Sequence, residues 1–251
     1  MSKAGLEINN LTVETEGKII VKGLSLNIAP GSIHTLMGPN GCGKSTLCLA
    51  LTGHPHYTIT GGNVVLNGKS LLAQNATERA LSGLMLAWQH PISLPGIKIS
   101  PFLRQVVNAH RVARHENPYS VSEFIQHLRR LMQQLDMKTT FAQRSVNDGL
   151  SGGEKKRLEM LMALLIEPKV LILDEIDSGL DIDAIKIVAQ QLKLLAKAGT
   201  GILIITHYHR LLDYIKPDRV HVILEGQIVR EGGNELALEL ERTSYEAISH
   251  V

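Results

Sequence analysis

Apolar and polar positions alternate through much of the first third of the chain. This two-residue period runs through the stretches 6–14, 18–28 and 32–37 and predicts short β-strands. Glu16-Gly17 and Pro30-Gly31 separate these stretches, and both are good turn pairs. Asn67-Gly68 predicts a further hairpin, because this dipeptide suits the backbone of a two-residue turn. We therefore expect antiparallel strands near the start of the chain.

The middle of the chain has a helical period instead. Apolar residues recur at intervals of four, three and four, which marks one helix face: Phe124, Leu128, Leu131 and Leu135. Ser120 and Glu123 have the spacing of a capping box at the start of this helix. Pro118 separates it from an earlier helical run over about 100–115. The proline-containing stretch 90–101 is interpreted as a flexible connection into this helical region.

From about residue 150 the pattern alternates between helix and buried strand. We predict a helix over 151–166, a strand over 170–174, a helix over about 182–198 and a strand over 201–206, followed by a hairpin over 219–232. Continuous apolar strands between amphipathic helices are typical of a parallel sheet covered on both faces. The sequence therefore predicts an α/β fold.

A glycine-rich motif lies between the predicted strand 32–37 and a helix. It fits G-x-x-x-x-G-K-[ST] and comprises Gly38, Pro39, Asn40, Gly41, Cys42, Gly43, Lys44, Ser45 and Thr46. The glycines allow backbone N–H groups to surround a phosphate chain, and the helix N-terminus adds partial positive charge. Lys44 is expected to bridge the β- and γ-phosphates, and the Ser45 hydroxyl to ligate Mg²⁺. The alternative, a glycine-rich turn that fits the motif by chance, is disfavoured because a predicted strand and helix flank the motif.

The sequence LILDEIDSGLDID places five carboxylates within ten residues. Asp174 ends an apolar strand, so we expect it to hold Mg²⁺, usually through water, and Glu175 to polarise the attacking water. Asp183 is expected in the first turn of the next helix, where negative charge suits the helix dipole. A calcium site is disfavoured because the EF-hand spacing is absent. Asp177 has no predicted role.

A third motif, Leu-Ser-Gly-Gly-Glu at 150–154, opens the predicted helix 151–166. Two glycines and a serine there would expose N–H groups and a hydroxyl at the positive end of the helix. We therefore expect a second phosphate-binding surface. It would be separate from the glycine-rich loop 38–46 (the P-loop), which is expected to surround a triphosphate.

Together these motifs resemble the ATP-binding cassette (ABC) ATPases, and the resemblance covers essentially the whole chain. It implies a P-loop (RecA-like) parallel-sheet core with an antiparallel β subdomain, together forming a catalytic lobe over 1–89 and 150–251, and an inserted helical subdomain over 90–149. Gln89 matches the Q-loop glutamine, which couples Mg²⁺ to partner contacts, and His207 matches the switch histidine that contacts the γ-phosphate. The resemblance also implies an ATP-dependent dimer in which Ser151, Gly152, Gly153 and Asp181 complete the partner's site.

Several stretches are similar, more specifically, to SufC, the ATPase subunit of the SUF iron–sulfur cluster assembly system. Ile176-Asp177 stands where many transporter cassettes have Pro-Thr. Lys155-Lys156-Arg157 follows the motif at 150–154, which matches the signature of the family, and the sequence YIKPD occupies 214–218. This resemblance implies SufB-like and SufD-like scaffold subunits as partners, docked against Gln89 to about residue 115. An ATP-binding subunit of a membrane ABC importer is the alternative. A nucleic-acid or ribosome module and a degenerate cassette are disfavoured.

The composition of the chain disfavours some classes of partner. The 251 residues carry a net charge of +2, which gives no broad electrostatic case for nucleic acid or a membrane surface. No run is long enough to span a membrane and the start lacks a signal-peptide pattern, so we expect a cytoplasmic protein. Cys42 and Cys48 are interpreted as reduced thiols on one helix, with Cys42 in the P-loop open to oxidation. Lys155 or Lys156 either forms a salt bridge with Glu175 or is solvated.

Overall fold

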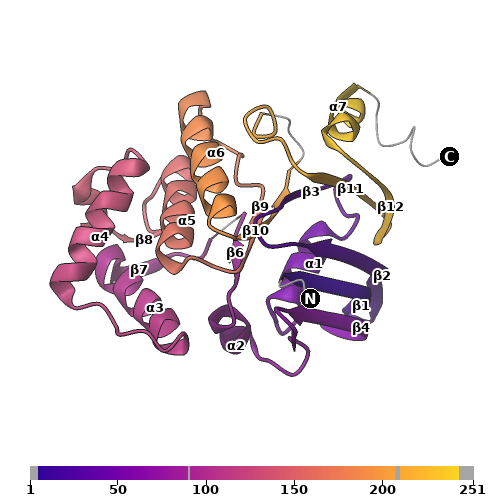
Figure 1. Cartoon of the computed structure of the whole chain (residues 1–251), viewed down its shortest axis with the longest axis horizontal. Coiled ribbons are helices and arrows are strands. Elements are labelled where there is room, and N and C mark those ends of the chain that lie inside the picture. Colours follow the sequence, from indigo (N-terminus) through magenta and orange to yellow (C-terminus); the bar gives the residue numbers. More distant parts are fainter. Residues whose placement is uncertain (1–4, 90, 207–209, 243–251) are drawn as a thin grey trace.

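The protein has a four-stranded antiparallel sheet, a small two-stranded antiparallel sheet and a mostly parallel sheet, with helices over the parallel one (Figure 1). The computed structural model describes residues 5–89, 91–206 and 210–242, and the side chains up to 240. The three sheets have the strand orders β2-β1-β4-β5, β12-β11-β3-β10-β9-β6 and β7-β8. This is the α/β fold expected from the sequence.

The antiparallel sheet is built from the alternating segments at the start of the chain. β1 (Leu6–Thr15) lies between β2 (Lys18–Ile28) and β4 (Thr58–Leu66), and β5 (Lys69–Ser70) completes the sheet. Asn67 and Gly68 have φ values of 49° and 80° and join β4 to β5, as the predicted hairpin requires. The apolar face packs on α1 (Lys44–Leu51) in one hydrophobic cluster.

The parallel sheet positions the candidate site. β11 (Arg219–Leu224), β3 (Ile33–Met37), β10 (Gly201–Ile205), β9 (Val170–Asp174) and β6 (Leu84–Ala87) run parallel, and β12 (Gln227–Gly232) adds an antiparallel edge. β3, β6, β9 and β10 are buried throughout, which explains their continuous apolar sequences. The carboxyl ends of these four strands meet at one edge, and each leads into a candidate functional segment. β6 was not predicted, because a four-residue apolar run alone carries no period.

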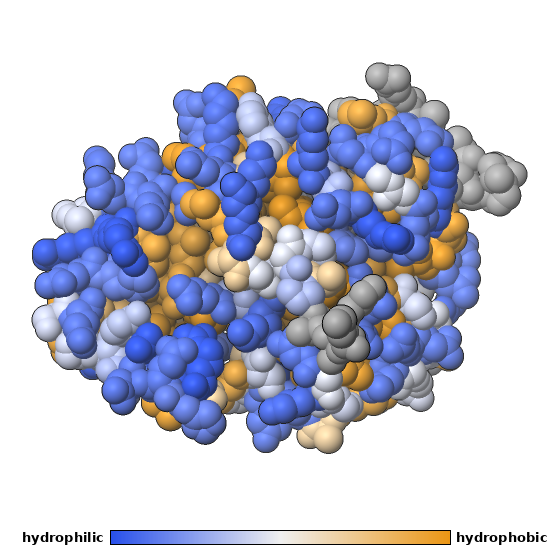
Figure 2. Space-filling view, in the orientation of Figure 1, coloured by the Kyte–Doolittle hydropathy of each residue, from blue (hydrophilic) through white to orange (hydrophobic). Residues whose placement is uncertain are grey.

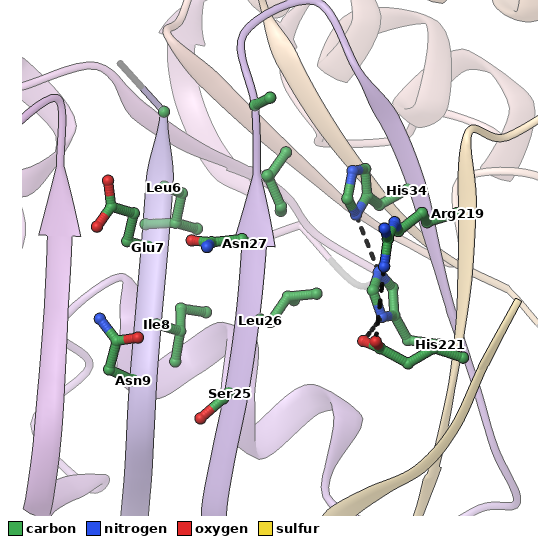
Figure 3. A pocket seen from close by; sticks show the side chains of 14 residues that line it. Leu6, Glu7, Ile8, Asn9, Ser25, Leu26, Asn27, His34, Arg219 and His221 are labelled. Carbon is green, nitrogen blue, oxygen red and sulfur yellow. Dashed lines mark hydrogen bonds and ion pairs between the residues drawn. The ribbon is translucent and has the colours of Figure 1, made fainter. Parts of the chain in front are cut away.

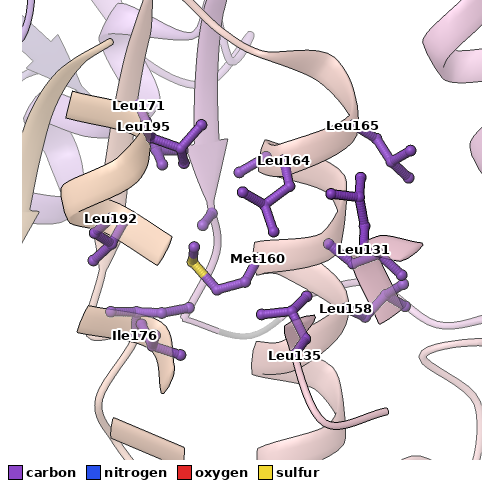
Figure 4. Close-up of a cluster of buried hydrophobic side chains, with 14 of the residues drawn as sticks. Leu131, Leu135, Leu158, Met160, Leu164, Leu165, Leu171, Ile176, Leu192 and Leu195 are labelled. Carbon is purple, nitrogen blue, oxygen red and sulfur yellow. The ribbon is translucent and has the colours of Figure 1, made fainter. Parts of the chain in front are cut away.

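The predicted helices around the parallel sheet are present and close to their expected bounds. α5 (Gly152–Ile166) and α6 (Ile182–Lys197) pack against each other and against the sheet. Figure 4 shows part of the cluster they form, with Met160 and Leu164 of α5 facing Leu192 and Leu195 of α6. α2 (Ala76–Leu81) and α7 (Asn234–Arg242) were not predicted.

Two helices of the middle region pack on α5. These are α3 (Ile99–Ala113) and α4 (Val121–Gln134), followed by the 3₁₀ turn η1 (Thr139–Gln143). The predicted capping box is confirmed, because Ser120 Oγ accepts the Glu123 N–H and the Glu123 carboxylate accepts the Ser120 N–H. The expected division at residues 90 and 149 stays a prediction.

The interpretation of 90–101 as a flexible connection was wrong for most of this stretch. Residues Leu94–Lys98 form β7, which pairs with β8 (Ser145–Val146). The Asn147 side chain also donates to Ile92 O at 3.0 Å, and Ser93 Oγ donates to Asn147 O at 2.8 Å. Pairing of β7 with a strand distant in sequence therefore orders this part of the chain.

Within the described residues, none of the helices has the length and apolar content of a membrane span. Figure 2 shows a mostly hydrophilic face on which apolar residues lie mainly in the recesses between elements.

Candidate nucleotide-binding site

The glycine-rich loop connects β3 to α1, as its motif requires. A Cβ atom at Gly38 would lie 2.3 Å from Ile223 O, so only glycine fits there. Gly43 precedes α1 with a φ of 110°, a conformation that a side chain would strain. The loop is therefore shaped by close backbone packing on one side, while Asn40, Gly41 and Ser45 are exposed on the other.

Lys44 extends into this loop. Its Nζ donates to Gly38 O and Pro39 O, each at 2.8 Å, and the residue is only 6% exposed. The ammonium group of Lys44 therefore lies within the loop, where it could neutralise the negative charge of phosphate oxygens. This arrangement fits the predicted role of Lys44.

Cys42 lies in the loop before α1, whereas Cys48 lies on α1. The interpretation that both belong to one helix was wrong, since α1 begins at Lys44. Both thiols are buried and free. Burial raises the pKa of the Cys42 thiol despite the neighbouring Lys44, and burial raises the pKa of Cys48 as well. A protonated, buried thiol reacts slowly, which weakens the expectation that Cys42 is open to oxidation.

Asp174 and Ser45 come together at the carboxyl edge of the sheet. Asp174 ends β9, is buried, and its carboxylate accepts a hydrogen bond from the Ser45 hydroxyl. Burial, and then the neighbouring Glu175, raise the pKa of the Asp174 carboxyl. A bound divalent cation would relieve this cost, and hydroxyl and carboxylate oxygens are the ligands that Mg²⁺ prefers.

The two residues therefore fit a magnesium site that is completed by the nucleotide. The described residues contain no group of three or more His, Cys, Asp or Glu side chains that could hold a metal alone. Mg²⁺ usually binds through one or two protein groups, with water and substrate phosphates as the other ligands.

Glu175 and Gln89 are in direct contact. Glu175 has a left-handed backbone, with a φ of 50°, and its N–H donates to Ile205 O at 2.9 Å. Its carboxylate accepts a hydrogen bond from the Gln89 side-chain amide. Non-glycine residues in this conformation cluster at functional sites, where the surrounding structure holds them.

Lys156 is buried on α5, so the solvated alternative is wrong for this residue. Its Nζ donates to Trp88 O at 3.2 Å and to Gln89 O at 3.1 Å. Burial lowers the pKa of the Lys156 ammonium, while Glu159 and the acids of the site oppose that effect. Lys156 thus contacts the glutamine that binds Glu175, and a direct Lys156–Glu175 bridge stays a prediction.

Asp177 gains a structural role that the sequence did not supply. It is buried, and its Oδ2 accepts the Thr206 hydroxyl at 2.9 Å, while its Oδ1 is buried without a hydrogen-bond partner among the described residues. Thr206 directly precedes His207, which lies outside the described residues. The hydrogen bond between Asp177 and Thr206 therefore connects the acidic loop, which follows β9, to the segment that leads to the predicted switch histidine.

The signature residues lie at the N-terminus of α5, where Ser151 and Glu154 form a capping box. Ser151, Gly152 and Asp181 are exposed, and Asp181 caps α6 by accepting the Ala184 N–H at 2.8 Å. Asp183 lies in the first turn of α6, as expected. These caps are structural, and the contact of Ser151, Gly152, Gly153 and Asp181 with a partner's nucleotide stays a prediction.

Glu159 was missed by the sequence analysis. It is a buried glutamate on the apolar side of the signature helix, and its carboxylate accepts the Trp88 N–H. Burial raises its pKa to about 7. An acidic residue one turn beyond the signature, among apolar neighbours, was the signal that could have identified it.

Comparisons with known proteins agree with this geometry. The family model described as "ABC transporter" matches residues 21–178. Vegetative protein 296 of Bacillus subtilis is 48% identical over 248 residues, covering 99% of this chain and 94% of that protein. The "probable ATP-dependent transporter slr0075" of Synechocystis is 46% identical over 246 residues, covering 98% and 96%.

A solved structure shares the fold over nearly its whole length. It is the dimeric, post-hydrolysis state of the ATP-binding cassette MJ0796 bound to ADP and Pi. The TM-score is 0.76 at 21% identity, covering 91% of this chain and 98% of that one. The chain therefore belongs to the ABC transporter family, as one of its ATP-binding cassettes with ATPase activity.

Proposed function

We propose that the residues at the carboxyl edge of the sheet divide the work of ATP hydrolysis among them. Backbone N–H groups of the loop 38–46 hold the phosphates, and Lys44 neutralises the β- and γ-phosphates. Glu175 orients the attacking water, and His207 contacts the γ-phosphate. Ser45, Asp174 and Gln89 would hold Mg²⁺, which would neutralise charge on the phosphates.

The chain works, in this proposal, as an ATP-dependent dimer. Support comes from the exposed signature at the N-terminus of α5, which has phosphate-binding chemistry but is separate in sequence from the P-loop. Glu175→Gln should block hydrolysis while keeping ATP bound, and so should strengthen the dimer. Light scattering at saturating Mg-ATP measures this, and a monomeric Glu175→Gln variant would contradict the two-site dimer.

We propose further that the chain is the SufC-type ATPase subunit of the SUF iron–sulfur cluster assembly system. The observation that carries this proposal is Asp177, which is buried against Thr206 at a position where many transporter cassettes have threonine. The stretches around the signature, the acidic loop and 214–218 support it by resemblance. The chain itself does not hold the cluster in this proposal, because its two cysteines are buried and a cluster normally has four protein ligands.

SufB-like and SufD-like scaffold subunits would dock between Gln89 and about residue 115. This region exposes Ile92 at 74%, Ile97 at 47% and Val112 at 58%, although large apolar side chains are usually buried. Arg104→Glu with Val112→Asp on α3 should abolish co-purification with the scaffold and leave ATP binding unchanged. Lys193→Glu, on the exposed side of α6, is the matched control. Unaltered co-purification of the α3 variant would move the interface elsewhere.

The second candidate is the ATP-binding subunit of a membrane ABC importer. It is favoured by the similarity to the Synechocystis relative, which is named a probable ATP-dependent transporter. Affinity purification of the tagged chain from its native cell, followed by mass spectrometry, separates the two. Soluble cytoplasmic scaffold proteins support the SUF proposal, and a polytopic permease recovered in detergent contradicts it. No nucleic-acid partner is proposed.

A further inference from the structure

The signature helix holds the Q-loop backbone through two polar side chains. Lys156 donates to the carbonyl oxygens of Trp88 and Gln89, and Glu159 accepts the N–H of Trp88. Lys156 and Glu159 are three residues apart on α5, so they share one helix face. An ammonium group and a carboxyl group thus bind two successive residues that directly follow β6.

Both side chains are almost completely buried. Lys156 is 4% exposed and Glu159 is 2% exposed, and Oε2 of Glu159 has no hydrogen-bond partner among the described residues. Burying two ionisable groups costs more free energy than burying apolar side chains of similar size. Packing alone would therefore favour apolar residues at these positions, whereas holding backbone donors and acceptors requires polar ones.

The position of the Q-loop backbone affects Glu175 through Gln89. Gln89 follows Trp88, and its side-chain amide donates to the Glu175 carboxylate. A shift of the Gln89 backbone would move the group that orients Glu175. Since a misplacement of about 1 Å can cost a hundredfold in rate, the restraint bears directly on hydrolysis.

We propose that Glu159, together with Lys156, is a positioning residue for ATP hydrolysis. The pair fixes the Q-loop backbone on the signature helix so that Gln89 meets Glu175. Neither residue touches the nucleotide in this scheme. The inference goes beyond the proposed SUF role and does not depend on it, because it concerns the ATPase step alone.

Two substitutions remove the restraint and one preserves part of it. Glu159→Leu removes the acceptor of the Trp88 N–H, and Lys156→Met removes the donor to both carbonyls. Glu159→Gln keeps an acceptor and serves as the conservative variant. Gln191→Leu is the matched control, because Gln191 is also buried, also has a side-chain oxygen without a partner among the described residues, and lies on α6.

Steady-state ATPase assays give the first measurement. Glu159→Leu and Lys156→Met should each lower kcat about tenfold and change the KM for ATP less than about twofold. Glu159→Gln should retain most of the parent kcat, as should Gln191→Leu. An equal fall in Gln191→Leu would show a general packing effect and overturn the proposal.

Trp88 provides a readout of the Q-loop itself, since it is the single tryptophan of the chain. Acrylamide should quench its fluorescence more strongly in Glu159→Leu and Lys156→Met than in the parent, with unchanged far-UV circular dichroism. Glu159→Gln and Gln191→Leu should match the parent. If Glu159→Leu does not fold, Lys156→Met decides. Unchanged quenching together with unchanged kcat in the folded variants overturns the proposal.

Discussion

The two ends of the six-stranded sheet both carry buried polar residues, but their polar groups are arranged differently. At the carboxyl end, Lys44, Asp174 and Asp177 are buried beside loops, and Asp177 keeps a carboxylate oxygen without a partner among the described residues. Near the start of β3 and β11, His34 and His221 are equally buried but bind each other. The first arrangement leaves polar capacity for a ligand, whereas the second uses its capacity internally.

The histidine end forms a continuous chain of contacts (Figure 3). Nδ1 of His34 lies 2.9 Å from Nε2 of His221, and Nδ1 of His221 lies 2.6 Å from Glu231 Oε1. If each Nδ1 carries the proton, His221 donates to Glu231 and accepts from His34, so one tautomer pair satisfies both bonds. Neighbouring Asp218 accepts the Ile33 N–H at 2.8 Å. A closed network of this kind is suited to stability and an open one to chemistry.

Lys44→Ala provides the largest expected contrast between the two ends. Removing the ammonium should lower kcat/KM for ATP about a thousandfold, or about 4 kcal/mol, because phosphate charge is left unneutralised in the transition state. The thermal midpoint should change little, since the polar contacts that are lost are those of Nζ with two loop carbonyls and with Cys42 Sγ. Coupled-enzyme ATPase assays and calorimetry check both parts. A loss of stability as large as the loss of activity would contradict the division between the two ends.

The histidine end should make the protein sensitive to acid. Burial, with His221 next, lowers the pKa of His34 to about 4 from its ordinary 6.5, although Asp218 and Glu231 oppose this. The pKa of His221 is also lowered by burial, against the effect of Glu231. Below pH 6.5 these two histidines therefore bind protons in the unfolded chain more readily than in the folded chain. The free energy of unfolding should fall by about 2 kcal/mol as the pH drops from about 6.5 to about 4.

His34→Asn tests this assignment. The introduced amide can still donate toward His221 but does not titrate, so the pH dependence of unfolding should become shallower over the same pH range. Urea unfolding at several pH values gives the slope. His56→Asn, at an exposed histidine, is the control and should keep the parent slope. An unchanged slope in His34→Asn would place the acid sensitivity elsewhere.

Asp177 sharpens the comparison, because it is a structural acid at the chemical end of the sheet. Asp177→Ala should lower the free energy of unfolding by about 1 kcal/mol, since Thr206 loses its acceptor. Asp177→Asn keeps an acceptor and should cost less. Chemical denaturation of the two variants measures the difference. Equal stability of Asp177→Ala and the parent would show that this contact contributes nothing.

The fold could be predicted where the sequence has a strong period or a specific motif. The helix around Phe124 and the buried strand ending at Asp174 are confirmed because their patterns are long or lead into chemistry. β6 and β7 were not predicted, because segments of only four or five residues become strands through partners that are distant in sequence. Their order depends on β9 and β8, which local pattern does not indicate.

The site could be predicted as a set of residue types but not as a set of contacts. The glycine-rich motif indicates Lys44 and Ser45, and the acidic motif indicates Asp174, because phosphate and Mg²⁺ chemistry limits the side chains that can serve. The roles of Glu159 and Asp177 depend on which backbone or hydroxyl group faces them after folding. The histidine pair could not be predicted for the same reason, since its members lie 187 positions apart in the sequence.

Cys42→Ser provides the smallest expected change. It tests whether burial makes the Cys42 thiol, at the carboxyl end of the sheet, unreactive. The Cys42 Sγ lies 3.8 Å from Lys44 Nζ and its thiol is buried, so serine should preserve the loop and alter kcat/KM by less than about threefold. In the parent, a thiol-specific reagent should react with neither cysteine on the timescale of a model thiol, because burial raises both pKa values. Rapid labelling of Cys42 in the nucleotide-free protein, prevented by ATP, would contradict this. It would show that the loop opens often enough for its chemistry to be reached from solvent, and that the carboxyl end is less preorganised than its contacts indicate.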